Sequence, residues 1–169
     1  LAVAIVSQGL DKRLALGIIR LTGNKTWRIV FGFVAISAFL SSFIGEHTVT
    51  AMMMPVGLTL VRNAGIDKKG TAKLAALILF SIAYGSAMGS IGTPSGGGRN
   101  VIMMSYWKDF GIVDITYLGW MKRAYPILIL EIPLAVLILW FSFRPKQRIL
   151  DSAVRRLKIQ VKKSGSITG

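Results

Sequence analysis

The chain has 169 residues, 53% of them hydrophobic, with a formal net charge of +14 and a pI near 10.7. The apolar residues come in long blocks, and the positive charges lie between these blocks rather than along one face of a folded domain. This arrangement excludes a soluble nucleic-acid-binding protein and predicts the lipid bilayer, not nucleic acid, as a partner. No cysteine is present, which excludes disulfides and thiolate metal sites. We therefore expect an all-α integral membrane protein.

The first segment, residues 1–25, is predicted to hold an interfacial helix. Residues 10–21 place apolar side chains on a short helical stretch bounded by charges, too short to cross a bilayer core of about 30 Å. Thr22, Gly23 and Asn24 then break the pattern. Because the chain starts at Leu1 in the middle of an apolar pattern, we expect it to be a piece of a longer protein.

Residues 26–62 are predicted to form a re-entrant helical hairpin with its tip at residues 45–50. The second apolar arm, residues 49–61, is about 20 Å long as a helix, against a bilayer core of about 30 Å. Lysines and arginines precede the first arm and follow the second, which places both outer ends in the cytoplasm. Two full crossings would also satisfy this charge pattern, but the short second arm favours the hairpin.

Residues 71–107 are predicted to form a discontinuous transmembrane helix with a loop at residues 91–100. Pro94 and the run Gly96–Gly98 interrupt an otherwise apolar helical pattern. Backbone released from helical pairing at membrane depth must be buried in protein or line a watery cavity, and such breaks often mark binding sites. The glycines do not form a phosphate loop of the Walker type, because its lysine and hydroxyl residue are absent.

The remaining segments complete a multi-pass topology in the cell (inner) membrane with basic loops in the cytoplasm. Residues 108–123 are predicted to be an external interfacial segment, residues 124–143 a transmembrane helix, and residues 144–169 a basic cytoplasmic tail. The tail is expected on the membrane surface or as a solvated linker helix. The lysines and arginines outside the segments assigned to the cytoplasm are Arg99, Lys108, Lys122 and Arg123.

Four ionisable side chains lie within the predicted spans: Glu46, His47, Arg99 and Glu131. A charged residue at the centre of a membrane helix costs about 2.5–3.5 kcal/mol on insertion scales, so each is a candidate functional residue. Glu46 and Arg99 each lie at a helix break, and we expect them to pair if the breaks meet. An ion pair at roughly 4 Å contributes about 4 kcal/mol at an effective dielectric constant of about 20.

Each of the other polar groups also has a structural interpretation. Glu131 stands alone and is expected to be protonated against a neighbouring helix, and His47 is able to bond its own loop. The three methionines 52–54 are expected to pack. No second histidine stands at metal spacing, and no serine–lysine or paired aspartate arrangement is evident, so we predict no catalytic residues and no enzyme.

Two motifs carry a resemblance to a known family. The run AFLSSFIGEHTVTAMMMPVGLTL resembles the first re-entrant hairpin of the divalent anion–sodium symporters, the citrate, dicarboxylate and sulfate carriers of the ion transporter superfamily. There the tip reads Ser-Asn-Thr-Ala-Thr. The run YGSAMGSIGTPSGGGRNVIM resembles the broken helix of that family, whose pattern is roughly YGASIGGIGTLIGTPPNLVL. The order of the flanking elements agrees over nearly the whole chain.

The resemblance implies one half of an inverted-repeat, elevator-type transporter that is usually a homodimer. The C-terminal repeat, with half of the substrate site, is missing from this chain. A small anion is the implied ligand, and sodium is the candidate coupling ion, with no other cofactor. Carried over to this sequence, the substrate-binding candidates are His47, Thr48, Thr50, Arg99 and Asn100. The ion-binding candidates are Ser42, Glu46, Gly92, Thr93 and Gly96.

The departures from the family pattern are charged. Ser-Asn of the hairpin tip is Glu46-His47 here, and Thr-Pro-Pro of the broken helix is Gly97-Gly98-Arg99. One hypothesis is that the Arg99 guanidinium, paired to Glu46, replaces a sodium ion and that Glu46 or His47 couples transport to protons. The rival hypothesis is that Arg99 binds the substrate anion directly.

The sequence thus predicts a fragment of a secondary active transporter for a di- or tricarboxylate or sulfate, coupled to sodium or protons. An arsenite-type or proton-linked antiporter of the same superfamily is the alternative within transport. A non-transporting membrane scaffold is the alternative from another class.

Overall fold

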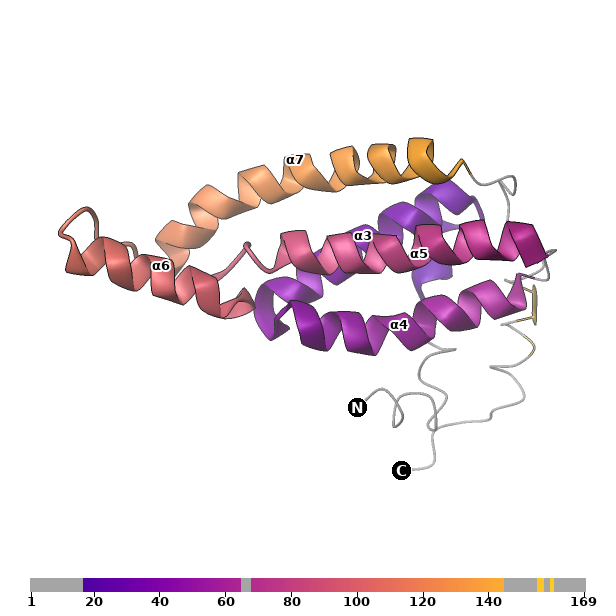
Figure 1. Ribbon diagram of the computed structural model, residues 1–169, viewed down its shortest axis with the longest axis horizontal. Helices are drawn as coiled ribbons and strands as arrows, with labels where there is room; N and C mark the ends of the chain where they lie inside the picture. Colours follow the sequence, from indigo (N-terminus) through magenta and orange to yellow (C-terminus); the bar gives the residue numbers. More distant parts are fainter. Residues whose placement is uncertain (1–16, 65–67, 145–154, 157–158, 160–169) are drawn as a thin grey trace, which may run out of the picture.

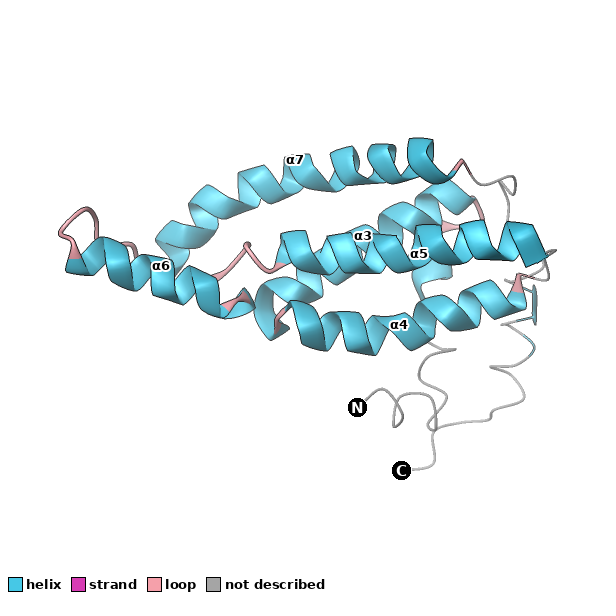
Figure 2. Ribbon diagram, viewed as in Figure 1, coloured by secondary structure: helices cyan, strands magenta, loops and turns pink. Residues whose placement is uncertain are grey.

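The computed structural model describes residues 17–64 and 68–144, together with residues 155, 156 and 159 (Figure 1). Its regular structure is helical (Figure 2): α3 (Thr26–Ile44), α4 (Glu46–Asn63), α5 (Lys68–Gly89), the 3₁₀ turn η1 (Pro94–Gly96), α6 (Gly98–Asp109) and α7 (Tyr117–Phe143). Stretches of α3, α5 and α7 are long and apolar enough to cross a membrane. The prediction of an all-α membrane protein is confirmed at this level.

The helices α3 and α4 form a hairpin whose turn is a single residue. Gly45 has φ 94°, a conformation that is strained for residues with a Cβ, and its N–H donates to the Ser41 carbonyl at 3.1 Å. The predicted tip at residues 45–50 is therefore shorter than expected, because Glu46 already begins α4. The second arm, α4, has 18 residues and is longer than the predicted apolar stretch 49–61, because its polar first turn is helical as well.

The helix α5 packs directly on α3 through two glycines one turn apart. A Cβ on Gly85 would lie 2.6 Å from the Val34 carbonyl oxygen, and one on Gly89 would lie 2.1 Å from the Ala38 carbonyl oxygen. No larger residue fits at these distances, so the backbones approach as closely as in small-residue contacts of membrane helices. The contact brings the end of α5 to the end of α3, next to the hairpin turn.

Two apolar clusters hold the bundle together. The larger one joins α3, α4 and α5, and its fully buried members include Phe33, Met53 and Ile78. The smaller one joins α3 and α5 to α7 through Val34, Leu77 and neighbouring residues. Met53 is 1% exposed and supports the expectation of packing at that position, whereas Met54 is exposed. In Figure 1, α4 and α7 flank the α3–α5 pair on opposite sides.

The boundaries after α5 differ from the predicted ones. The helix α6 begins at Gly98, so the loop ends before Arg99 and Asn100 rather than after them. The helix α7 begins at Tyr117 and not at residue 124, because the Thr116 side chain caps it by accepting from Gly119 N–H at 3.1 Å. The predicted external segment 108–123 is therefore divided among the end of α6, a connection and the start of α7.

The two predicted surface segments lie largely outside the described residues. Of the predicted interfacial segment 1–25, residues 17–25 are described, and residues 17–22 are helical. Of the basic tail, the structure describes Arg144 and residues 155, 156 and 159.

Candidate functional site

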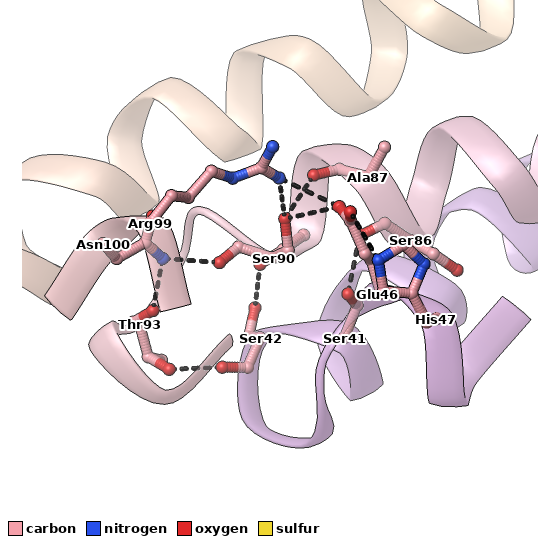
Figure 3. A network of polar contacts seen from close by, with 11 residues as sticks. Ser41, Ser42, Glu46, His47, Ser86, Ala87, Ser90, Thr93, Arg99 and Asn100 are labelled. Atoms are coloured by element: carbon pink, nitrogen blue, oxygen red, sulfur yellow. Dashed lines mark hydrogen bonds and ion pairs between the residues drawn. The ribbon is translucent and has the colours of Figure 1, made fainter. Parts of the chain in front are cut away.

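The hairpin turn and the break between α5 and α6 meet at one pocket. It has a volume of about 400 Å³ and is lined by residues 44–48 from the hairpin and residues 95–99 from the break. Figure 3 shows the side chains of Glu46, from the hairpin, and Arg99, from the start of α6, pointing toward one another. The structure thus brings the two sequence motifs together, as the hypothesis of a shared site requires.

The predicted pair between Glu46 and Arg99 is confirmed. Arg99 Nη2 donates to Glu46 Oε2 at 2.9 Å and to Ser90 Oγ at 2.6 Å, and Ser90 Oγ lies 3.1 Å from the same carboxylate oxygen (Figure 3). The Arg99 side chain is 59% exposed and that of Glu46 is 27% exposed. Glu46 also occupies the first turn of α4, where the helix dipole favours a negative charge.

The remaining hairpin candidates, His47, Thr48 and Thr50, differ in their relation to the pocket. His47 Nε2 is 3.5 Å from Glu46 Oε1, and its side chain is 97% exposed at the rim of the pocket. Thr48 is exposed and lines the pocket. Thr50 is half-buried and is not among the lining residues, so the structure does not join it to the others.

Asn100 fixes the shape of the break rather than facing the pocket. Its side chain is buried, and its Nδ2 donates to the carbonyl oxygens of Ser90 at 2.7 Å and of Thr93 at 2.8 Å. These two bonds span the loop and hold its ends together. An amide is suited to this task because its NH₂ group offers two donors at one atom.

The ion-binding candidates also gather, on the inner side of the loop. Ser42 Oγ lies 2.9 Å from the Gly89 carbonyl oxygen, and Thr93 Oγ1 donates to the Ser42 carbonyl. Gly92 faces Ser42, and a Cβ at Gly92 would lie 2.6 Å from Ser42 Oγ. Gly96 lies against the Ser90 carbonyl, and a Cβ there would lie 2.5 Å from the carbonyl oxygen. Unwound backbone carbonyls of this kind suit a small cation, although several of these already accept a hydrogen bond.

Two helices start at the pocket. The first N–H groups of α4 and of α6 have no helical partner, and no described side chain caps either helix. Because the helix dipole adds a partial positive charge there, both ends favour an anion. Together with the Arg99 guanidinium, they make the pocket attractive to a carboxylate despite the nearby Glu46.

Sequence reasoning missed three residues of the site: Ser90, Ser95 and Tyr117. Ser90 bonds both members of the ion pair, and Ser95 lines the pocket. Both positions depart from the family pattern, which has glycine and isoleucine there, and this was a usable signal. Tyr117 is 22 residues from Ser95, its hydrogen-bond partner, and nothing in the local sequence indicated the contact.

Glu131, the fourth ionisable candidate, lies elsewhere. It is half-buried in an apolar groove of about 560 Å³ between α5 and α7, together with Phe80 and Tyr84. The structure therefore does not bring it to the pocket.

Comparison with known proteins shows that the chain is similar to transport proteins. A model of the citrate transporter family matches residues 1–168. The chain is 30% identical over 171 residues to sodium-dependent high-affinity dicarboxylate transporter 3 of Caenorhabditis elegans, covering 93% of this chain and 30% of the relative. It is 30% identical over 146 residues to a transporter of Haemophilus influenzae, covering 86% of this chain and 30% of the relative.

A bacterial sodium-dependent dicarboxylate transporter, SdcS of Staphylococcus saprophyticus, is 25% identical over 174 residues, covering 99% of this chain and 34% of the relative. The chain therefore spans about a third of the length of the curated relatives that it matches.

Proposed function

The chain belongs to the citrate transporter family, and we propose that it forms part of a membrane carrier for a di- or tricarboxylate. The family and its relatives are transporters, not enzymes. The observation that carries the proposal is the pocket between the hairpin turn and the helix break, with one guanidinium and two helix N-termini at its wall.

In this proposal a substrate carboxylate binds Arg99. The contacts to Glu46 and Ser90 use only Nη2, and a guanidinium has five N–H donors in a planar fork. The donors on the other nitrogens are therefore left for a carboxylate, which they match in geometry. The hydroxyl of Thr48 and the first N–H groups of α4 and α6 supply further donors at the same wall.

Because the contacts to Glu46 and Ser90 use Nη2 alone, Arg99 is able to bind an anion while it stays paired, and we propose that the Glu46–Arg99 pair also reduces the need for sodium. The guanidinium provides a fixed positive charge beside the loop where the related symporters are expected to hold their ion. Glu46, or the exposed His47 beside it, then exchanges a proton during transport. Sodium remains the second candidate, favoured by the names of the relatives and by the carbonyl oxygens of the loop.

We further propose that the hairpin is re-entrant and that this chain is one of two inverted repeats of a homodimeric carrier. Two observations support this. Among the residues that the structure describes, the hairpin turn and the break alone line the pocket, and Asn100 is the only buried residue of α6. In this proposal the second repeat covers both surfaces. We also propose that the carrier lies in the cell (inner) membrane with its basic loops in the cytoplasm.

The test is transport by the intact gene product that contains this chain, reconstituted in liposomes. Uptake of labelled citrate and succinate is measured with and without sodium, between about pH 5.5 and pH 8, the range in which histidine titrates. Uptake without sodium that rises in acid is expected. Strict sodium dependence with a flat pH profile would overturn proton coupling, and no uptake of either anion would overturn the carrier function.

A binding measurement separates a carrier from a membrane scaffold. A carrier is stabilised by its anion as RT ln(1 + [L]/Kd), so its unfolding temperature rises with citrate concentration. A scaffold shows no such rise.

A further inference from the structure

A row of three hydroxyl groups leads from the start of α7 to the hairpin. Thr93 Oγ1 donates to the Ser42 carbonyl oxygen, Ser95 Oγ lies 3.0 Å from Thr93 Oγ1, and Tyr117 Oη lies 2.8 Å from Ser95 Oγ. The middle member, Ser95, is exposed and lines the pocket. The hydrogen bonds that orient the Ser95 hydroxyl therefore decide whether it donates to or accepts from a molecule bound in the pocket.

The direction of each hydrogen bond follows from the number of protons. A hydroxyl group has one proton and two lone pairs. The Thr93 proton points to the Ser42 carbonyl, which accepts only, and the Thr93 oxygen also accepts from Gly96 N–H at 3.2 Å. Ser95 must therefore donate to Thr93. Since the Ser95 proton is then used, Tyr117 must donate to Ser95.

The row thus presents Ser95 to the pocket as an acceptor. Ser95 donates its one proton to Thr93 Oγ1, one of its lone pairs accepts from Tyr117, and one lone pair remains. A carboxylate oxygen offers no proton and gains nothing from this group. A hydroxyl group on the bound anion offers a proton and forms a hydrogen bond.

We propose that Ser95 is a specificity residue that favours anions bearing a hydroxyl group over the same anions without it. Tyr117 is its positioning residue. This inference rests on the proposed carrier function, because it assigns one contact within the same pocket.

The start of α7 is well placed to hold Tyr117. The Thr116 cap fixes its first turn, and Trp120 Nε1 donates to the Ile91 carbonyl oxygen at 2.8 Å. The start of α7 is therefore attached to the loop at two points, through Ile91 and through Ser95. The loop and the tyrosine hydroxyl keep their relative position without any contribution from the ligand.

The experiment compares succinate with its 2-hydroxy derivative, malate, in uptake by the intact gene product in liposomes. The wild type is expected to show a KM about three- to tenfold lower for malate, the preference that one neutral hydrogen bond supplies. Ser95→Ala should abolish this preference, so that the KM values for malate and succinate become nearly equal. Ser95→Thr, which keeps the hydroxyl, should retain it. Tyr117→Phe should reduce the preference about twofold, because Ser95 is then less well held.

Tyr106→Phe is the matched control, since that tyrosine lies on α6, stacks on Phe110 and does not line the pocket. It should behave as the wild type. Equal KM values for the two anions in the wild type, or an undiminished preference in Ser95→Ala, would overturn the inference while leaving the carrier function intact. Uptake of neither anion by the wild type would instead refute the carrier function. If Ser95→Ala accumulates poorly, Ser95→Cys, a much weaker acceptor, is expected to lose the preference in its place.

Discussion

Arg99 Nη2 lies 2.9 Å from Glu46 Oε2, although 53 residues separate the two in the chain. Each residue stands in the first turn of its helix, so the pair joins the start of α4 to the start of α6. The ion pair therefore links the hairpin to the broken helix at the mouth of the pocket. Glu46 also competes with a bound anion for the Arg99 guanidinium, because its carboxylate lies beside it.

The stabilising effect of this pair is measurable by a double-mutant cycle with Glu46→Gln and Arg99→Gln. Because the arginine is 59% exposed, we expect a coupling free energy of about 0.5–1 kcal/mol. The readout is the free energy of unfolding of the intact gene product in detergent at two salt concentrations. A coupling energy of zero would show that the pair does not hold the two helices together.

Substitutions of Arg99 and Glu46 should change the affinity for citrate in opposite directions. Arg99→Gln removes a charged donor and should weaken citrate binding by about tenfold or more. Glu46→Gln removes the competing carboxylate and should strengthen binding at neutral pH, and it should also reduce the response to acid. Isothermal titration with citrate between about pH 5.5 and pH 8 tests both. Weaker binding in both variants would show that the pair acts as a unit.

Asn100→Asp should open the loop. The change removes the Nδ2 donor and places a carboxylate against the carbonyl oxygens of Ser90 and Thr93. We expect a loss of about 2–3 kcal/mol of stability, because buried acceptors then face each other. Hydrogen exchange should increase at the amides of residues 90–97.

The matched control for this change is Asn63→Asp, whose amide donates to Thr59 on α4 and does not line the pocket. Exchange in the loop should not respond to it. Equal exchange in the two variants would contradict the role assigned to Asn100.

Gly89→Ala should disrupt the contact between α3 and α5. The added methyl group would lie 2.1 Å from the Ala38 carbonyl oxygen, which is backbone and has no room to move away. Overpacking of this kind costs about 1–3 kcal/mol or more, and we expect the melting temperature to fall. Gly17→Ala is the control, because nothing lies within 4 Å of its added Cβ, and it should be neutral. An unchanged melting temperature for Gly89→Ala would mean that the helices pack less closely.

Much of the helical layout followed from the sequence because apolar length and helix breakers dominate in a membrane protein. The break after α5 was located by Pro94 and its glycines, and the Glu46–Arg99 pair by the cost of an unpaired charge. Helix ends were less accurate: the Thr116 cap added the first turns of α7, and Glu46 and Thr48 joined α4 although they are polar. A helix predicted from the length of its apolar stretch omits the polar residues at its ends, which are helical because of capping and backbone hydrogen bonds.

The detailed site was less predictable, for a different reason. Ser95 and Tyr117 meet only because α7 folds back beside the loop, and no local pattern reports such a long-range contact. Thr50 was grouped with Thr48 from the motif, yet helical geometry turns the two residues to different sides of α4.

The backbone around the pocket and the polar groups that line it depend on different residues. The glycine contact between α5 and α3 positions the backbone. The end of α5 is set by backbone touching backbone, so the loop begins at the same place whichever side chains stand at positions 46, 47, 95 and 99. A change at these positions alters charge or hydrogen bonding at the rim, while the backbone contact between α3 and α5 stays in place. Single substitutions at the rim are therefore expected to change the ligand preference of the pocket in small steps. A panel of such substitutions would be an efficient way to alter that preference.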